Sequence, residues 1–96
     1  MERFVMTTYR YRDGLSADDL RELTTKFTKV GNFPGTLAHY TRLDGRGGFV
    51  LRKLEPEEDT AKVFEVTIEY APWVEFDVVP VTTIEEAFPV IQSVYG

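Results

Sequence analysis

The chain has 96 residues, a formal net charge of -5 and no cysteine. This length holds one domain, residues 1–96, and the lack of cysteine excludes disulfides and thiolate metal sites. Sixteen acidic residues against eleven basic ones argue against a nucleic-acid partner. We expect a cytoplasmic protein with no membrane partner, because no basic segment leads into an uninterrupted apolar stretch.

The first two predicted elements are a strand and a helix. Residues 3–11, RFVMTTYRY, are rich in β-branched and aromatic types on both faces and predict a strand. Ser16 then offers an N-cap with Asp19 three residues on, and apolar residues recur at helical spacing as far as Val30. Gly31 suits the left-handed conformation that closes helices. We therefore predict a helix that begins at Ser16 and ends at Gly31.

The stretch HYTRLDGRGGFVLRKLE, residues 39–55, fits either a phosphate loop or a turn between two strands. A phosphate loop leads from a strand through glycines into a helix whose free amides meet the anion. Here FVLRKL follows the glycines, and its composition is that of a strand. We predict a hairpin between TLAHYTRL, residues 36–43, and FVLRKL, with turn glycines at positive φ.

Residues 56–71 are predicted to form a helix, although KVFEVTIEYA has a strand-like composition. Pro56 and the three acids after it make a favourable helix start. Ala61, Phe64 and Ile68 also fall on one helical stripe. The helix is expected to stop at Pro72.

A strand and a final helix complete the chain. WVEFDVVPV, residues 73–81, predicts a strand at a sheet edge or with Pro80 near its end, because proline cannot donate to a ladder. Thr83 with Glu86 predicts a capping box for a short last helix, kinked or interrupted at Pro89.

This order of elements predicts an α+β fold, the ferredoxin-like βαββαβ sandwich with an extra C-terminal helix. Such a fold has a four-stranded antiparallel sheet with two helices on one face. The other face stays uncovered, yet the predicted strands place apolar side chains on it, which costs ~25 cal/mol per Å² in water. The sheet of a second copy is the natural cover, so we predict a homodimer.

The layout, the glycine hairpin followed by FVL, and APWVEFDVVPV at residues 71–81 resemble a family of small uncharacterised bacterial proteins in the dimeric α+β barrel superfamily. The resemblance covers nearly the whole chain and includes no catalytic signature. It implies a homodimer whose two sheets face each other and enclose a space. The wider superfamily includes cofactor-independent monooxygenases, small isomerases, haem-degrading enzymes and ligand-binding modules, so the fold alone does not choose a function.

Four residues are candidates for catalysis: His39, Asp77, Arg52 and Tyr9. His39, the only histidine, would be a general base or a haem ligand if it pointed into the space between the sheets, and otherwise a structural strand residue. Asp77 is an acid within an apolar strand, and Arg52 is its expected counter-charge. On the uncovered face the two would form a ligand-binding spot with Tyr9 and Thr7. The alternatives are an ion pair at the dimer interface or two separate edge charges.

Trp73, Phe76 and Val79 are predicted at the dimer interface, where Trp73 would be an aromatic anchor. No cluster has metal-ligand spacing, so no metal or cofactor is expected. The sequence predicts a homodimeric module that binds a small ligand or interacts with a partner. One alternative is a cofactor-independent oxygenase or isomerase acting on a small aromatic substrate. Another is a regulatory module that binds a protein through acidic helices at 57–69 and 83–94.

Overall fold

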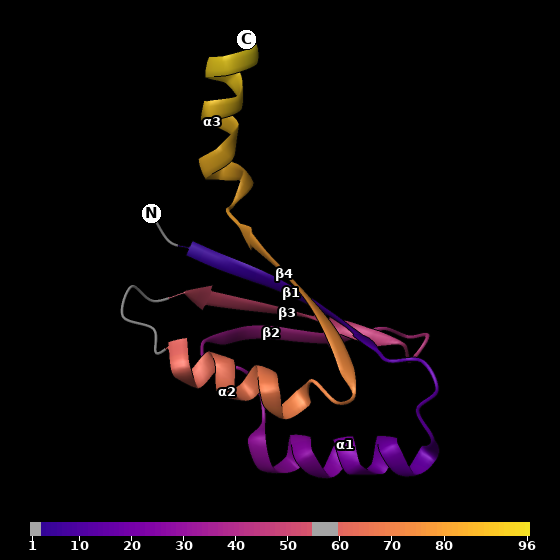
Figure 1. Ribbon diagram of the computed structural model, residues 1–96. Helices are drawn as coiled ribbons and strands as arrows, with labels where there is room; N and C mark the ends of the chain where they lie inside the picture. Colours follow the sequence, from indigo (N-terminus) through magenta and orange to yellow (C-terminus); the bar gives the residue numbers. More distant parts are fainter. Residues whose placement is uncertain (1–2, 55–59) are drawn as a thin grey trace.

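The fold is a four-stranded antiparallel sheet with two helices on one face and a third helix that stands apart (Figure 1). The computed structural model of the chain describes residues 3–54 and 60–96. The elements are β1 (Arg3–Tyr11), α1 (Ala17–Val30), β2 (Thr36–Thr41), β3 (Gly47–Leu54), α2 (Thr60–Tyr70), β4 (Val74–Val81) and α3 (Ile84–Tyr95). The strand order is β2-β3-β1-β4. This confirms the ferredoxin-like arrangement with an extra C-terminal helix.

Local sequence signals set both ends of α1. The Asp19 N–H donates to the Ser16 hydroxyl at 3.1 Å, and the Ser16 N–H donates to the Asp19 carboxylate at 2.8 Å. Gly31 closes the helix with φ 76°, and its N–H donates to the Phe27 carbonyl at 2.8 Å. The predicted N-cap and C-cap are therefore confirmed.

The helix predicted within residues 56–71 is present as α2. However, the side that it buries is not the predicted stripe of Ala61, Phe64 and Ile68. Val66 and Tyr70 are buried and pack against Val74, whereas Phe64 and Ile68 are 63% and 54% exposed. Apolar residues lie all round this helix, so periodicity alone could not tell which side meets the sheet. The predicted acidic start at 56–59 lies outside the described residues.

The helix α3 begins at the predicted cap and runs through its proline. The Thr83 hydroxyl accepts from the Glu86 N–H at 3.2 Å, and the Thr82 hydroxyl donates to the Glu86 carboxylate at 2.9 Å. Pro89 does not interrupt the helix, which tolerates the loss of one hydrogen bond. No residue of α3 is buried. It stands on the side of the sheet opposite α1 and α2 (Figure 1).

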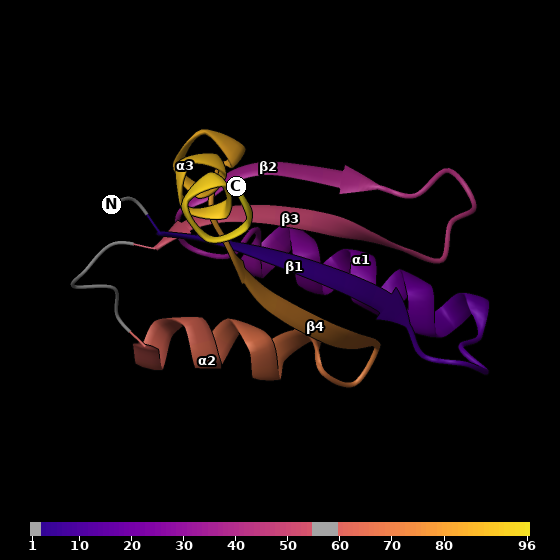
Figure 2. The ribbon, with the colours of Figure 1, turned by 90° about the horizontal axis from the view of Figure 1, so that it is seen from above.

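Cross-strand register assigns each strand residue to one of the two sheet faces. The helix-covered face carries Val5, Thr7, Tyr9, Tyr11, His39, Val50, Arg52, Val74, Phe76 and Val78. The open face carries Phe4, Met6, Thr8, Ala38, Tyr40, Phe49, Leu51, Asp77, Val79 and Val81. Figure 2 looks down on the open face, with α3 seen along its axis. The open face is rich in apolar side chains, as predicted.

The glycines at 45–48 form the predicted hairpin between β2 and β3, and not a phosphate loop. Gly45 lies in the turn with φ 73°, a conformation that favours glycine. A Cβ at Gly47 would lie 2.0 Å from the carbonyl oxygen of Tyr9. A Cβ at Gly48 would lie 2.4 Å from the Tyr40 carbonyl oxygen and 2.5 Å from the Tyr9 hydroxyl. Gly48 is therefore required for space and not for positive φ.

We expect Gly47→Ala to lower the free energy of unfolding by more than about 2 kcal/mol, because the methyl group would collide with the β1 backbone. Gly45→Asn in the same hairpin is the control, since asparagine tolerates the left-handed region and open space surrounds Gly45. Its expected loss is below about 1 kcal/mol. Urea unfolding followed by Trp73 fluorescence measures both variants, and equal losses would contradict the steric role of Gly47.

Candidate functional site

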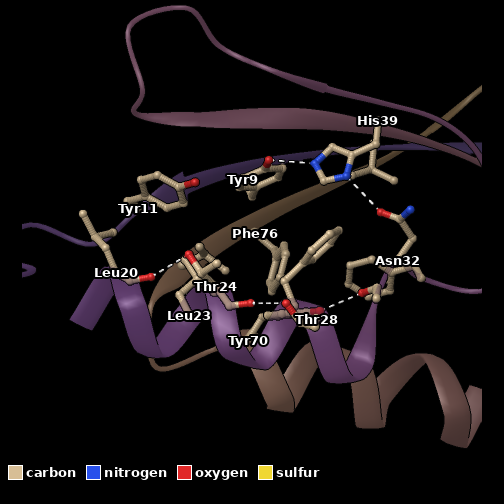
Figure 3. A pocket seen from close by; sticks show the side chains of 15 residues that line it. Tyr9, Tyr11, Leu20, Leu23, Thr24, Thr28, Asn32, His39, Tyr70 and Phe76 are labelled. Atoms are coloured by element: carbon tan, nitrogen blue, oxygen red, sulfur yellow. Dashed lines mark hydrogen bonds between the residues drawn. The ribbon is translucent and has the colours of Figure 1, made fainter. Parts of the chain in front are cut away.

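A cavity of about 420 Å³ lies between α1 and the helix-covered face of the sheet (Figure 3). The sheet contributes Tyr9, Tyr11, His39, Val50, Val74 and Phe76 to its walls. The helices and the segment after α1 contribute Leu20, Leu23, Thr24, Phe27, Thr28, Gly31, Asn32, Phe33 and Tyr70. Its size falls in the range of small-molecule pockets, and its walls are mostly apolar and aromatic.

The cavity exists because α1 is held by α2 more than by the sheet. The Tyr70 hydroxyl donates to the Gly31 carbonyl at 2.7 Å, and the Lys26 ammonium lies 2.6 Å from the Glu69 carboxylate. Leu20 and Phe27 of α1 point toward the sheet and line the cavity, yet they remain 39% and 43% exposed to solvent. Side chains therefore do not fill the space between α1 and the strands.

A row of hydrogen bonds crosses one wall of the cavity (Figure 3). His39 Nδ1 lies 2.9 Å from Asn32 Oδ1, and His39 Nε2 lies 2.7 Å from the Tyr9 hydroxyl oxygen. The Asn32 oxygen can only accept, so Nδ1 carries the imidazole proton. Nε2 then accepts from the Tyr9 hydroxyl, and the Tyr9 oxygen, which the Thr41 side chain also meets, keeps a lone pair that can accept a further hydrogen bond.

Aromatic rings surround this row. The His39 ring meets Tyr9 and Phe27 edge-on, with ring centroids 5.5 and 6.0 Å apart. His39 keeps part of its surface exposed to solvent, and the partial burial of the rest lowers its pKa below the ordinary value. Burial also raises the pKa of Tyr9, and the nearby Tyr11 raises it further, whereas a hydrogen bond with the Thr41 side chain lowers it by a smaller amount. Both shifts favour the neutral forms, so the row is uncharged at neutral pH.

The bond between Tyr9 and His39 passes over Gly48. Tyr9 in β1 lies opposite Gly48 in β3, and β2, which carries His39, lies on the far side of β3. A Cβ at Gly48 would lie 2.5 Å from the Tyr9 hydroxyl oxygen. The second glycine of the hairpin therefore leaves the room that Tyr9 needs to reach across one strand.

Arg52 and Asp77, which were predicted to pair, lie on opposite faces of the sheet. Arg52 is opposite Val5 and Asp77 is opposite Thr8, and an odd separation along β1 reverses the face. The buried Arg52 guanidinium donates to the Pro34 carbonyl at 2.8 Å. The expected polar spot on the uncovered face is therefore wrong, because alternation within each strand says nothing of the register between strands.

The remaining predicted site residues are spread over both faces. Thr7 is buried on the helix-covered face, outside the cavity lining. Trp73 and Phe76 pack against the core of their own chain, and Phe76 meets Phe33 edge-on at 5.6 Å between centroids. Val79 lies on the open face, where its role at an interface stays a prediction.

Sequence reasoning named His39 and Tyr9 but missed Asn32, which comes directly after the helix-closing Gly31. Its only signal is a polar residue in a turn, which is common.

Both ring nitrogens of His39 are engaged within the chain, so haem would have to displace one of these partners to bind His39. Within residues 3–54 and 60–96, no cluster of His, Cys, Asp and Glu could hold a metal ion, and no helix could span a membrane.

Comparison with known proteins gives a family and a fold. A profile described as a domain of unknown function, DUF3303, matches residues 4–95. The chain belongs to the DUF3303 family. No curated protein sequence matches this DUF3303 chain.

Two solved structures resemble the DUF3303 chain. One is a dimeric ferredoxin-like protein of unknown function from Thermobifida fusca YX, with a TM-score of 0.56 and 16% identity over 86% of this chain and 92% of that chain. The other bears the name of a candidate chlorite dismutase, with a TM-score of 0.55 and 15% identity over 83% of this chain and 43% of that chain. At these identities the likeness shows the shared fold.

The lowered pKa of His39 predicts a pH dependence of stability in this DUF3303 protein. A group whose folded pKa lies below its unfolded value, about 6.5 for histidine, binds fewer protons when folded. Its contribution to stability is complete above the unfolded value and is lost as the pH falls through the folded one. We expect the free energy of unfolding to fall between about pH 7 and about pH 5, and to fall less in His39→Gln. Urea titrations across this range measure the difference, and equal slopes would contradict a lowered pKa of His39 in the folded protein.

Proposed function

We propose that the protein is a homodimeric module that binds a small aromatic molecule in the cavity between α1 and the sheet. The observation that carries this proposal is the Asn32–His39–Tyr9 row at the wall of a cavity that is otherwise mostly apolar and aromatic. Small-molecule sites typically combine apolar walls with a few placed polar groups that orient the ligand. A hydrophobic core packed only for stability would have neither this empty space nor a row of hydrogen bonds along its wall.

The direction of the hydrogen bonds limits the polar group of the ligand. Tyr9 gives its single hydroxyl proton to His39, so its oxygen accepts from a ligand hydroxyl or N–H. No lysine or arginine lines the cavity among the described residues, which favours a neutral ligand over a carboxylate. The edges and faces of Tyr11, Phe27 and Phe76 suit a flat ring. A phenol has both required features.

The catalytic alternative, a cofactor-independent oxygenase or isomerase, has one observation in its favour. His39 is neutral, its Nε2 is an acceptor, and Asn32 holds the opposite nitrogen. A ligand hydroxyl could pass its proton to the Tyr9 oxygen while the Tyr9 proton moves to Nε2. The products are a phenolate and an imidazolium that Asn32 stabilises. Turnover would then require His39, whereas binding requires mainly the Tyr9 oxygen.

The homodimer rests on two observations. The open face of the sheet carries exposed apolar side chains, among them Phe49 at 42% and Val79 at 46%. The similar protein from Thermobifida fusca YX is dimeric. Two open faces packed against each other would remove this surface from water.

We expect 2-naphthol to bind the wild-type protein more tightly than 2-methoxynaphthalene, by a factor of about 10, because only the naphthol can donate to the Tyr9 oxygen. In Tyr9→Phe the two ligands should bind equally. The control is Tyr40→Phe, which makes the same change on the open face and should leave both affinities unchanged. Ligand fluorescence titration measures these affinities.

Two results of this titration would contradict the proposal, and each would contradict a different part of it. Equal binding of both ligands to the wild type would contradict the assigned direction of the hydrogen bond. If neither ligand bound, the cavity would not be a site for flat aromatic molecules.

A further inference from the structure

The helix α3 carries an apolar stripe that packing within the chain leaves exposed. Ile84, Phe88, Ile91 and Val94 recur at helical spacing and are between 43% and 67% exposed. Figure 1 shows α3 standing away from the sheet, on the open-face side. An isolated helix of 12 residues is marginal in water, so a helix of this kind needs a surface to pack against.

The dimensions of the chain indicate how much surface is left open. A compact domain of this length has a radius of gyration of about 12.5 Å and exposes about 5,600 Å². This chain has a radius of gyration of 16.0 Å and exposes 7101 Å². The excess of about 1,500 Å² is larger than the roughly 800 Å² that each partner buries in a standard interface. The open surface is therefore sufficient for a stable dimer.

The length of α3 indicates which part of a second copy it reaches. Facing sheets pack about 10 Å apart, whereas a helix of 12 residues is about 18 Å long. Figures 1 and 2 together show the axis of α3 pointing away from the open face. In a dimer with facing sheets, α3 would therefore pass the margin of the partner sheet. Its last turn would lie level with the partner's helices.

The helical layer has an apolar surface of the matching kind. Phe64 and Ile68 lie one turn apart on the same side of α2 and are 63% and 54% exposed. Within its own chain, α2 packs through Val66 and Tyr70 and leaves this pair outside. Each chain thus carries an exposed apolar stripe on α3 and an exposed apolar side on α2. In a two-fold dimer, α3 of each copy can pack on α2 of the other, so both surfaces are covered twice.

We propose that α3 is an exchanged arm. Ile91 and Val94, near its end, dock on Phe64 and Ile68 of α2 in a second copy of the chain, and the second copy does the same in return. This inference rests on the homodimer proposed above and adds to it the contact that the arm makes.

The first test compares two charge insertions on α3. Ile91→Asp places a carboxylate in the docking stripe, and the matched control Gln92→Asp places it at the next, exposed position. We expect Ile91→Asp to raise the dimer dissociation constant by a factor of about 100, because symmetry removes the buried side chain twice. Gln92→Asp should change it less than about threefold. Sedimentation equilibrium of the full chain measures both.

The second test uses the absence of natural cysteine, which makes every disulfide unambiguous. Tagged Tyr95→Cys, which lies one turn after Ile91 on the stripe side of α3, is mixed with untagged Glu65→Cys in α2 and oxidised. We expect a disulfide between tagged and untagged chains. Arg21→Cys, an exposed position on α1, replaces Glu65→Cys as the control and should give none above background.

The outcomes separate this inference from the homodimer. A wild-type chain that is monomeric at about 100 µM would overturn both. A dimer that resists Ile91→Asp, or that gives no disulfide between positions 95 and 65, would overturn the exchanged arm and leave the homodimer standing.

Discussion

The register of β1 against β3 is the constraint on which the candidate site depends. It places Gly48 opposite Tyr9, and the missing side chain lets the phenol cross β3 to His39 on the next strand. Asn32 then orients the imidazole from the far side. A shift of this register by one residue would turn Tyr9 toward the open face and separate it from His39. The glycine hairpin therefore shapes the site through the space that it leaves, although it is not a phosphate loop.

Within the described residues, packing is incomplete between α1 and the sheet and on the open face with α3, and these regions differ in chemistry. Between α1 and the sheet, the walls are aromatic and a neutral polar row faces the space, which is the character of a ligand site. On the open face and along α3, the exposed side chains are apolar and belong to extended surfaces, which is the character of an interface. A chain of this size buries little surface on its own, so a partner copy is a physically economical source of stability.

Membership of the DUF3303 family and likeness to ferredoxin-like structures establish the fold and leave the chemistry open. Folds of this kind carry many activities, so the function has to be argued from the site. Here the donors and acceptors of the Asn32–His39–Tyr9 row define the polar side of the proposed ligand site. A tyrosine that donates to a neutral histidine presents an acceptor oxygen, and that oxygen selects ligands with a hydroxyl or N–H.

The sequence by itself determined the features that depend on neighbours a few residues apart. These are the capping box of Ser16 and Asp19, the closing Gly31, and the hairpin that follows from a strand after the glycines. Only the tertiary structure decided which side of α2 is buried, that Arg52 and Asp77 lie on opposite faces, and that Asn32 meets His39. The physical reason is the distance along the chain between the residues that interact. Caps and turns are local hydrogen-bond arrangements, whereas register and helix orientation are set by contacts between segments that are distant in the chain.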